Sequence, residues 1–200
     1  MKSIDVQGQS RSEFGKKGAK ALRKENFIPC NLYGVEKDKD GKAVATAFKV
    51  TTEAVRNLVY SPDIYSVNLT IDGKTVKAVM KEIQFHAVKD TILHIDFYQI
   101  TEDKPIVMQV PVKLSGLAAG VKAGGKLEQN MRLLKVKAIY TAIPEKIEID
   151  VTDLAIGKTI KVGDLKQEGL EFINAKDAVV CHVAATRSSA MAEESAEEAK

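Results

Sequence analysis

The chain has 200 residues, of which 44% are hydrophobic and 28% are charged, and its formal net charge is +3. A chain of this length forms one large or two small domains, and this composition excludes collagen-like, mucin-like and wholly disordered proteins. No run of about 18 apolar residues predicts a membrane-spanning helix. The first five residues lack the apolar segment of a signal peptide, so we expect a cytosolic protein.

Residues 1–99 are predicted to form a first domain in which strands outnumber short helices. The clearest local signal is Asp72-Gly73 between two alternating apolar runs, which predicts a β-hairpin with a type I′ turn. In chain order, the expected elements are strand Ile4–Gln7, helix 15–25, strand Phe27–Tyr33, a polar turn over 37–41, strand Ala43–Val50, a helix from a Thr51 or Thr52 cap to Tyr60, and strands Ile64–Ile71, Lys74–Phe85 and Thr91–Ile100.

Residues 100–184 are predicted to form a second, all-β domain. The polar stretch Thr101–Pro105 ends in proline and is typical of a domain linker. Beyond it, strands are expected at Ile106–Leu114, Arg132–Tyr140, Lys146–Val151, Thr159–Val162, Glu171–Ile173 and Ala178–Val183. Residues 185–200 are rich in Ser, Ala and Glu, which predicts a disordered acidic tail. The expected fold class is therefore mainly β with short helices.

The sequence offers little for catalysis or metal binding. Gly120–Lys126 spells GxxxxGK, but Leu127 follows it where a phosphate-binding loop needs Ser or Thr, so we expect a flexible connection between strands. Cys181 and His182 are neighbours and would point to opposite faces of a strand, which excludes a catalytic pair. Two cysteines and three histidines do not suit a structural zinc site; Cys30 and Cys181 are expected to be core or half-buried residues. No enzymatic activity, metal or cofactor is predicted.

The helix expected over residues 15–25 is basic on one side. Advancing 100° per residue places five cations within an arc of about 120°. These cations are Lys16, Lys17, Lys20, Arg23 and Lys24. An arc of one charge sign repels itself unless an anionic partner lies against it, which favours nucleic acid over a merely solvated face. A membrane surface is disfavoured, because the opposite side of the helix carries mainly Gly and Ala and cannot insert deeply.

The strand expected at Thr91–Ile100 supplies a second surface. Alternation predicts a core face of Leu93, Ile95 and Phe97 and an outer face of Ile92, His94, Asp96 and Tyr98. The outer face is either a solvated surface with a His–Asp contact or a β-surface that binds polar base edges and 2′-hydroxyls of RNA. A carboxylate in such a site accepts hydrogen bonds from base amines or hydroxyls and does not bind phosphate.

Several short motifs together resemble one bacterial family. In chain order they are Arg11, Gly15–Lys24, Ile28-Pro29, Tyr33-Gly34, Gln84, His86, His94–Phe97, Val110–Val112, Gly116, Gly120-Val121 and Ile143–Asp150. This pattern spans about residues 3–184. It resembles the long, two-domain form of a family of large-subunit ribosomal proteins that binds 5S ribosomal RNA and includes the general stress protein Ctc.

The resemblance implies a small N-terminal β-barrel that binds RNA, followed by a separate β-rich domain. It implies a cytoplasmic, ribosome-associated protein whose partners are 5S rRNA, at its loop E region, the large ribosomal subunit and neighbouring ribosomal proteins. Family positions associated with RNA contact are Arg11, Lys20, Tyr33, His94 and Asp96, with Lys16 and Arg23 as backbone contacts and Gln84 and His86 as weaker candidates.

The sequence departs from the family pattern at three places in this region. Cys30-Asn31 replaces the usual small or apolar pair, with no obvious consequence for RNA binding. Lys20-Ala21 stands where the family commonly has two arginines, and lysine cannot form the planar two-donor fork of arginine. Asn26 replaces a common glycine and tolerates the same left-handed backbone. Two other functions remain open from the sequence: an RNA-binding stress or regulatory protein that acts off the ribosome, and an unrelated enzyme or scaffold with a basic helix.

Overall fold

The computed structural model describes residues 2–34, 44–101, 104–167 and 169–186. The chain divides into two compact units, one made of Met1–Ile106 and Ile139–Glu145 and the other of Val107–Ala138 and Lys146–Lys200. Both are mainly β, which confirms the predicted fold class.

The polar turn predicted over 37–41 lies outside the described residues, as does all but the start of the tail predicted over 185–200. No helix in the described ranges is both long and apolar enough to cross a membrane.

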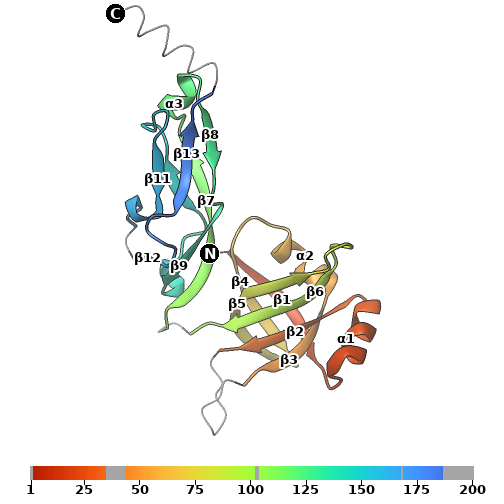
Figure 1. The fold of residues 1–200 in the computed structure, drawn as a ribbon. Helices are drawn as coiled ribbons and strands as arrows, with labels where there is room; N and C mark the ends of the chain where they lie inside the picture. The colour runs from red at the N-terminus through yellow and green to blue at the C-terminus, as the bar shows by residue number, and fades with distance from the viewer. Residues whose placement is uncertain (1, 35–43, 102–103, 168, 187–200) are drawn as a thin grey trace, which may run out of the picture. The chain divides into compact units, whose positions relative to one another are not determined.

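Six strands of the first unit close into a barrel in the order β1-β3-β2-β6-β5-β4 (Figure 1). Their bounds are β1 (Lys2–Ser10), β2 (Phe27–Tyr33), β3 (Thr46–Thr51), β4 (Tyr65–Ile71), β5 (Lys74–Phe85) and β6 (Ile92–Gln99). Strand β1 completes the ring, because it pairs antiparallel with β3 and parallel with β4. Strands β2 and β6 are also parallel neighbours. Closure removes the strand edges that an open sheet would expose.

The β4–β5 hairpin has the predicted type I′ turn. Asp72 and Gly73 have φ angles of 47° and 85°, so both central residues are left-handed, as this turn requires. Strand β5 has the predicted bounds. Asn26, between α1 and β2, is also left-handed, with φ of 62°, and its carbonyl accepts hydrogen bonds from the backbone and hydroxyl of Thr52.

The barrel is filled by apolar side chains from all six strands. Phe48 and Phe97 are fully buried, and their ring centroids lie 5.7 Å apart. Helix α2 (Thr52–Val59) adds Val55 and Leu58 to this core. The burial of Cys30 on β2 agrees with the sequence prediction.

Helix α1 (Gly15–Lys24) lies on the outside of the barrel, beside β2 (Figure 1). Only Gly18 is buried, and Ala19 and Leu22 are half-buried, so the helix docks through small residues. Its basic side therefore stays in solvent, as its sequence predicts.

The second unit contains a four-stranded sheet, ordered β10-β7-β9-β12, and a three-stranded sheet, ordered β11-β13-β8. The remaining elements of the chain are β7 (Ile106–Ser115), α3 (Ala119–Lys122), β8 (Lys126–Gln129), β9 (Leu133–Ala138), η1 (Tyr140–Ala142), β10 (Ile147–Asp150), β11 (Thr159–Lys161), η2 (Val162–Asp164), β12 (Glu171–Phe172) and β13 (Val179–Ala184). The sequence did not predict α3 or β8. Cys181 on β13 is buried, as expected.

The glycine-rich segment 120–126 is not the flexible connection expected from the sequence. It forms the end of α3, a tight turn and the first residue of β8. A Cβ atom on Gly120 would lie 2.7 Å from the backbone nitrogen of Ile156, and one on Gly125 would lie 2.6 Å from a methyl group of Val183. These glycines are therefore required by close packing.

The prediction for the strand at Thr91–Ile100 is wrong at its start. Ile92 is buried and Leu93 is only partly buried, although alternation assigned Leu93 to the core and Ile92 to the outer face. The physical reason is a β-bulge: Phe85 pairs with Ile92 and Gln84 pairs with His94, so Leu93 is an extra residue on β6. From Ile95 onward the predicted faces are correct.

A matched pair of valines tests the barrel core. Val67 on β4 has no solvent exposure, whereas Val88 in the β5–β6 turn is 88% exposed. Val67→Ala should lower the free energy of unfolding by about 2 kcal/mol, because two buried methyl groups are lost and a cavity remains. Val88→Ala should change it by less than about 0.5 kcal/mol. Urea unfolding of both variants measures this; equal effects would contradict the assigned core.

Candidate nucleic-acid interface

Polar side chains cover the outer surface where β2, β6 and β5 lie side by side. Asp96 of β6 is paired in register with Asn31 of β2 on one side and with Glu82 of β5 on the other. His94 is paired with Gln84 of β5. The strand register therefore brings together three predicted site residues and two that the sequence did not single out.

This surface coincides with a local shift in strand register. Between Met80 and Glu82, β5 has one extra residue, and between Ile92 and His94, β6 has one extra residue. The second bulge restores the register that the first one changed. Glu82, Gln84, His94 and Asp96 all lie between the two bulges. Bulges re-aim side chains and are common beside functional sites.

His94 and Asp96 point to the same side of β6 and lie against each other. His94 Nδ1 is 3.4 Å from Asp96 Oδ1, and the two side chains are 20% and 24% exposed. Burial lowers the pKa of His94, and the cations of Arg11 and Arg23 lower it further, while the carboxylates of Asp96 and Glu82 oppose this. The neutral ring is thus favoured near pH 7. A proton on Nδ1 faces Asp96, which leaves Nε2 as a hydrogen-bond acceptor.

Arg11 follows β1 and lies at the edge of the same surface. Its guanidinium carbon is 5.4 Å from the ring centroid of Phe14, and its Nε is buried with no hydrogen-bond acceptor among the described residues. It also lines an open pocket of about 290 Å³. The pocket is lined by Ser10, Arg11, Ser12, Glu13, Ala21, Leu22, Glu25 and Lys49. A buried cationic donor without an acceptor favours an anionic ligand.

The cations of α1 differ in their contacts. Within the described part of the chain, Lys16 and Lys20 are exposed and form no salt bridge. Arg23 instead turns toward β6, and its Nε and Nη2 both donate to the carbonyl oxygen of Leu93, at 3.0 and 2.9 Å. The structure thus separates Arg23 from the lysines with which the sequence grouped it.

Tyr33 lies on β2 beside Tyr98 of β6. Their rings meet edge to face, with centroids 5.8 Å apart and an interplanar angle of 76°. Burial raises the pKa of Tyr33, and the carboxylates of Asp96 and Glu82 raise it further. Its hydroxyl therefore stays protonated and can donate a hydrogen bond.

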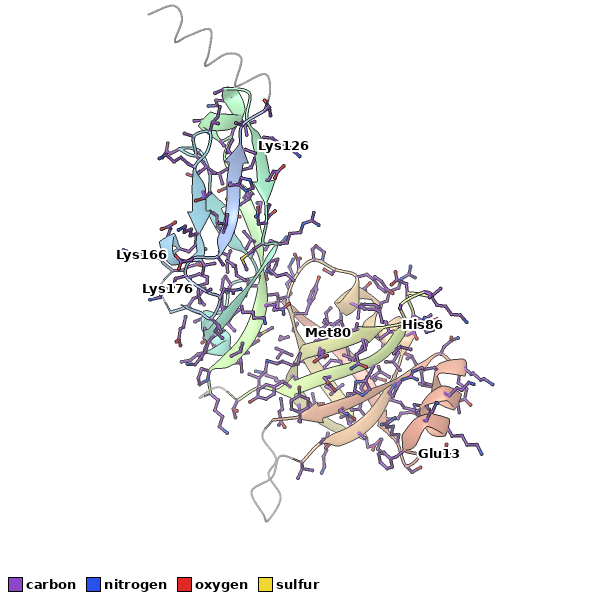
Figure 2. All side chains as sticks on the ribbon, in the orientation of Figure 1. Glu13, Met80, His86, Lys126, Lys166 and Lys176 are labelled. Atoms are coloured by element: carbon purple, nitrogen blue, oxygen red, sulfur yellow. The ribbon has the colours of Figure 1, made fainter. Side chains whose placement is uncertain are left out.

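The two weaker candidates lie in different places. Gln84 is exposed on β5 beside His94, so it belongs to the surface. His86 lies beyond the end of β5, in the turn before β6 (Figure 2). Its Nδ1 accepts hydrogen bonds from the backbone of Val88 and Lys89, both at 3.2 Å, so this nitrogen orders the turn.

Asn31 and Glu82 are the residues of this surface that sequence reasoning missed. Each is polar on a predicted strand, but only the pairing of β2 and β5 with β6 brings them beside Asp96. Among the residues that the structure describes, no three His, Cys, Asp or Glu side chains gather into a metal-binding group. The surface combines carboxylates, amides, an imidazole and tyrosine hydroxyls, with cations at its edge, which suits a polyanion that also presents hydrogen-bonding groups.

Comparisons with known proteins agree in both halves of the chain. Residues 6–97 match the Ribosomal L25p family, and residues 105–187 match the C-terminal domain of ribosomal protein TL5. The chain is 62% identical over 187 residues to large ribosomal subunit protein bL25 of Phocaeicola vulgatus, covering 94% of each chain. It is 58% identical over 188 residues to that of Porphyromonas gingivalis, covering 94% of this chain and 95% of the relative.

An N-terminal barrel of the L25p family followed by a β-rich domain of the TL5 C-terminal family defines a ribosomal protein of the large subunit. Its place is the ribosome in the bacterial cytoplasm, and it is not an enzyme. The chain belongs to the bL25 family, in its long two-domain form. This confirms the family resemblance found in the sequence.

The depressed pKa of His94 predicts how this residue affects stability. The unfolded chain keeps the ordinary histidine pKa, so as the pH falls through about 6.5 the unfolded state binds a proton that the folded state does not. Protonation therefore favours unfolding until the pH falls below the lower, folded pKa. His94→Gln removes this group, so it should lose less stability than the unmodified protein between pH 7.5 and 5.5.

Urea unfolding at several pH values measures this difference. Lys16→Gln, which replaces an exposed side chain of α1, serves as the control and should keep the pH dependence of the unmodified protein. An unchanged slope for His94→Gln would show that the His94 ring is not held in its neutral form.

Proposed function

We propose that this protein binds 5S rRNA, at the loop E region, through the outer surface of its N-terminal barrel. The observation that carries the proposal is the arrangement of α1 and β6. A helix with one-sided positive charge lies beside a strand surface on which His94 and Asp96 hold each other in place. Arg11, Tyr33 and Gln84 complete this surface, and Glu82 joins it as a residue outside the sequence prediction.

Affinity comes chiefly from Lys16 and Lys20. Both are exposed and form no salt bridge within the described residues, so their charges are available to phosphates. Each contact releases counterions, which makes binding salt-dependent. Lys20 acts as a point charge, because an ammonium group cannot form the two-donor fork of arginine. Arg11 gains from RNA the acceptor that its buried Nε lacks in the free protein.

Discrimination comes from the strand surface. The Asp96 carboxylate and His94 Nε2 accept hydrogen bonds, and Tyr33 donates one. Carboxylates repel phosphate, so Asp96 and Glu82 accept a ligand only where base amines or 2′-hydroxyls face them. The wide, shallow minor groove of RNA presents such groups. His86 contributes through Nε2, since its Nδ1 is used within the turn.

Binding to 5S rRNA and to transfer RNA, together with a chemical footprint of 5S rRNA, tests this function. We expect preferential binding to 5S rRNA and protection confined to loop E. Equal affinity for the two RNAs would contradict the proposal. Preferential binding without cosedimentation with large subunits would instead favour a role away from the ribosome.

Lys16→Ala should weaken binding to 5S rRNA and to a random hairpin RNA by similar factors. The reason is that a phosphate contact carries no sequence information. The dependence of log affinity on log salt should fall by about one unit or less. Lys77→Ala, on β5 beside β4, is the matched control and should leave the salt dependence unchanged. If Lys16→Ala also leaves it unchanged, this lysine is only solvated.

Asp96→Asn keeps the size of the side chain but turns one acceptor oxygen into a donor. His94→Ala removes an acceptor and leaves the core residues Ile95 and Phe97 in place. Losing one such group from a buried contact costs about 1–3 kcal/mol, so each variant should bind 5S rRNA about 5- to 150-fold more weakly. Binding to non-cognate RNA should hardly change.

Glu53→Gln on α2 provides the control for Asp96→Asn, because it makes the same change of charge at an exposed position away from the strand surface. It should bind 5S rRNA like the unmodified protein. Suppose that both strand variants melt at much lower temperature yet bind 5S rRNA normally once folded. The His94–Asp96 pair would then be a structural hydrogen bond only.

A further inference from the structure

The backbone carbonyl group of Leu93 lies at the second bulge, near the start of β6. Leu93 is the extra residue of the second bulge, and its peptide bond leads directly into His94. A bulge disrupts the regular ladder of backbone hydrogen bonds, so its polar groups need other partners. Arg23 of α1, which lies 70 residues earlier in the chain than Leu93, supplies a partner for this carbonyl oxygen.

The contact constrains the backbone more than a single hydrogen bond would. Nε and Nη2 of Arg23 lie 3.0 and 2.9 Å from the same oxygen, so the guanidinium plane is fixed relative to the carbonyl. The peptide group that contains this carbonyl is planar and also contains the backbone nitrogen of His94. The position of α1 therefore constrains the backbone at the start of the candidate site.

We propose that Arg23 is a positioning residue, which joins the basic helix to the bulge before His94 so that the phosphate-binding lysines and the His94–Asp96 pair act as one rigid surface. This inference rests on the proposed binding of 5S rRNA. A surface arranged before binding loses less conformational entropy when it meets its ligand. The role differs from a direct phosphate contact, which needs only the positive charge of Arg23.

Arg23→Lys separates these two roles, because it keeps the charge and loses the two-donor fork. If Arg23 positions His94, this variant should bind 5S rRNA at least about fivefold more weakly. Its affinity for transfer RNA and its salt dependence should stay unchanged, since no charge is lost. Arg23→Gln should show the same loss of preference and, in addition, weaker binding to both RNAs. Arg56→Lys on α2 is the matched control and should bind both RNAs normally.

A double-mutant cycle tests whether Arg23 acts through His94. In a His94→Ala background, Arg23→Lys should cause little further loss of 5S rRNA binding, whereas Lys16→Ala should cause its full loss. Additive effects of Arg23→Lys and His94→Ala would overturn the inference. So would a 5S rRNA affinity of Arg23→Lys equal to that of the unmodified protein.

An NMR titration of the His94 ring gives a readout without RNA. Burial of the ring and the charges of Asp96, Arg11 and Glu82 also act on its pKa, but only Arg23 is changed. When the fork is lost, the cation moves away from the bulge and the pKa of His94 should rise toward its ordinary value. An unchanged titration would overturn the positioning role, whatever the RNA result. In contrast, a shifted titration in a protein that does not prefer 5S rRNA would refute the proposed function and leave the coupling of helix and strand intact.

Discussion

Closure of the six-stranded barrel is the constraint on which the rest of the first unit depends. Because β1 pairs with both β3 and β4, every strand has two neighbours and every side chain points either into a closed interior or out of it. Apolar side chains, among them Phe48 and Phe97, fill that interior, where an unpartnered polar group would be costly. Polar residues on β2, β5 and β6 are therefore forced outward, onto one continuous surface.

The two compensating bulges then decide which outward residues meet. Without them, Asp96 would be paired with a different residue of β5, since the register between the bulges differs by one position from the register outside them. The shift is confined to a few residues, so the core contacts before and after it are preserved. It also leaves Leu93 outside the regular pattern, where Arg23 reaches its carbonyl. The irregular part of the sheet thus carries both the His94–Asp96 pair and the contact with Arg23.

Local sequence patterns predicted the elements well but not the contacts between them. The Asp72-Gly73 turn and the one-sided charge of α1 depend only on residues close together in the chain, so the sequence predicts them directly. The bulge at Leu93 depends on the register between two strands, which the residues of β6 alone do not encode. The same holds for the juxtaposition of Asn31 and Glu82 with Asp96.

Strand β8 and the contact of Arg23 with Leu93 were not predicted for similar physical reasons. Strand β8 has a polar sequence, Lys126–Gln129, and becomes a strand only because it pairs with β13. The contact of Arg23 joins residues 70 positions apart, so no helical wheel distinguishes this cation from its neighbours. In both cases a partner distant in sequence decides the outcome.

The parallel pairing of β2 with β6 also has a consequence for the order of synthesis. Strand β2 and the cations of α1 are made early, whereas β6, with His94 and Asp96, is the last barrel strand to leave the ribosome. Until then the barrel cannot close, because β2 and β5 lack their common neighbour. The nascent chain thus exposes the cations of α1 before the surface that carries His94 and Asp96 exists. That surface forms in one late step, together with the long-range contacts that complete folding.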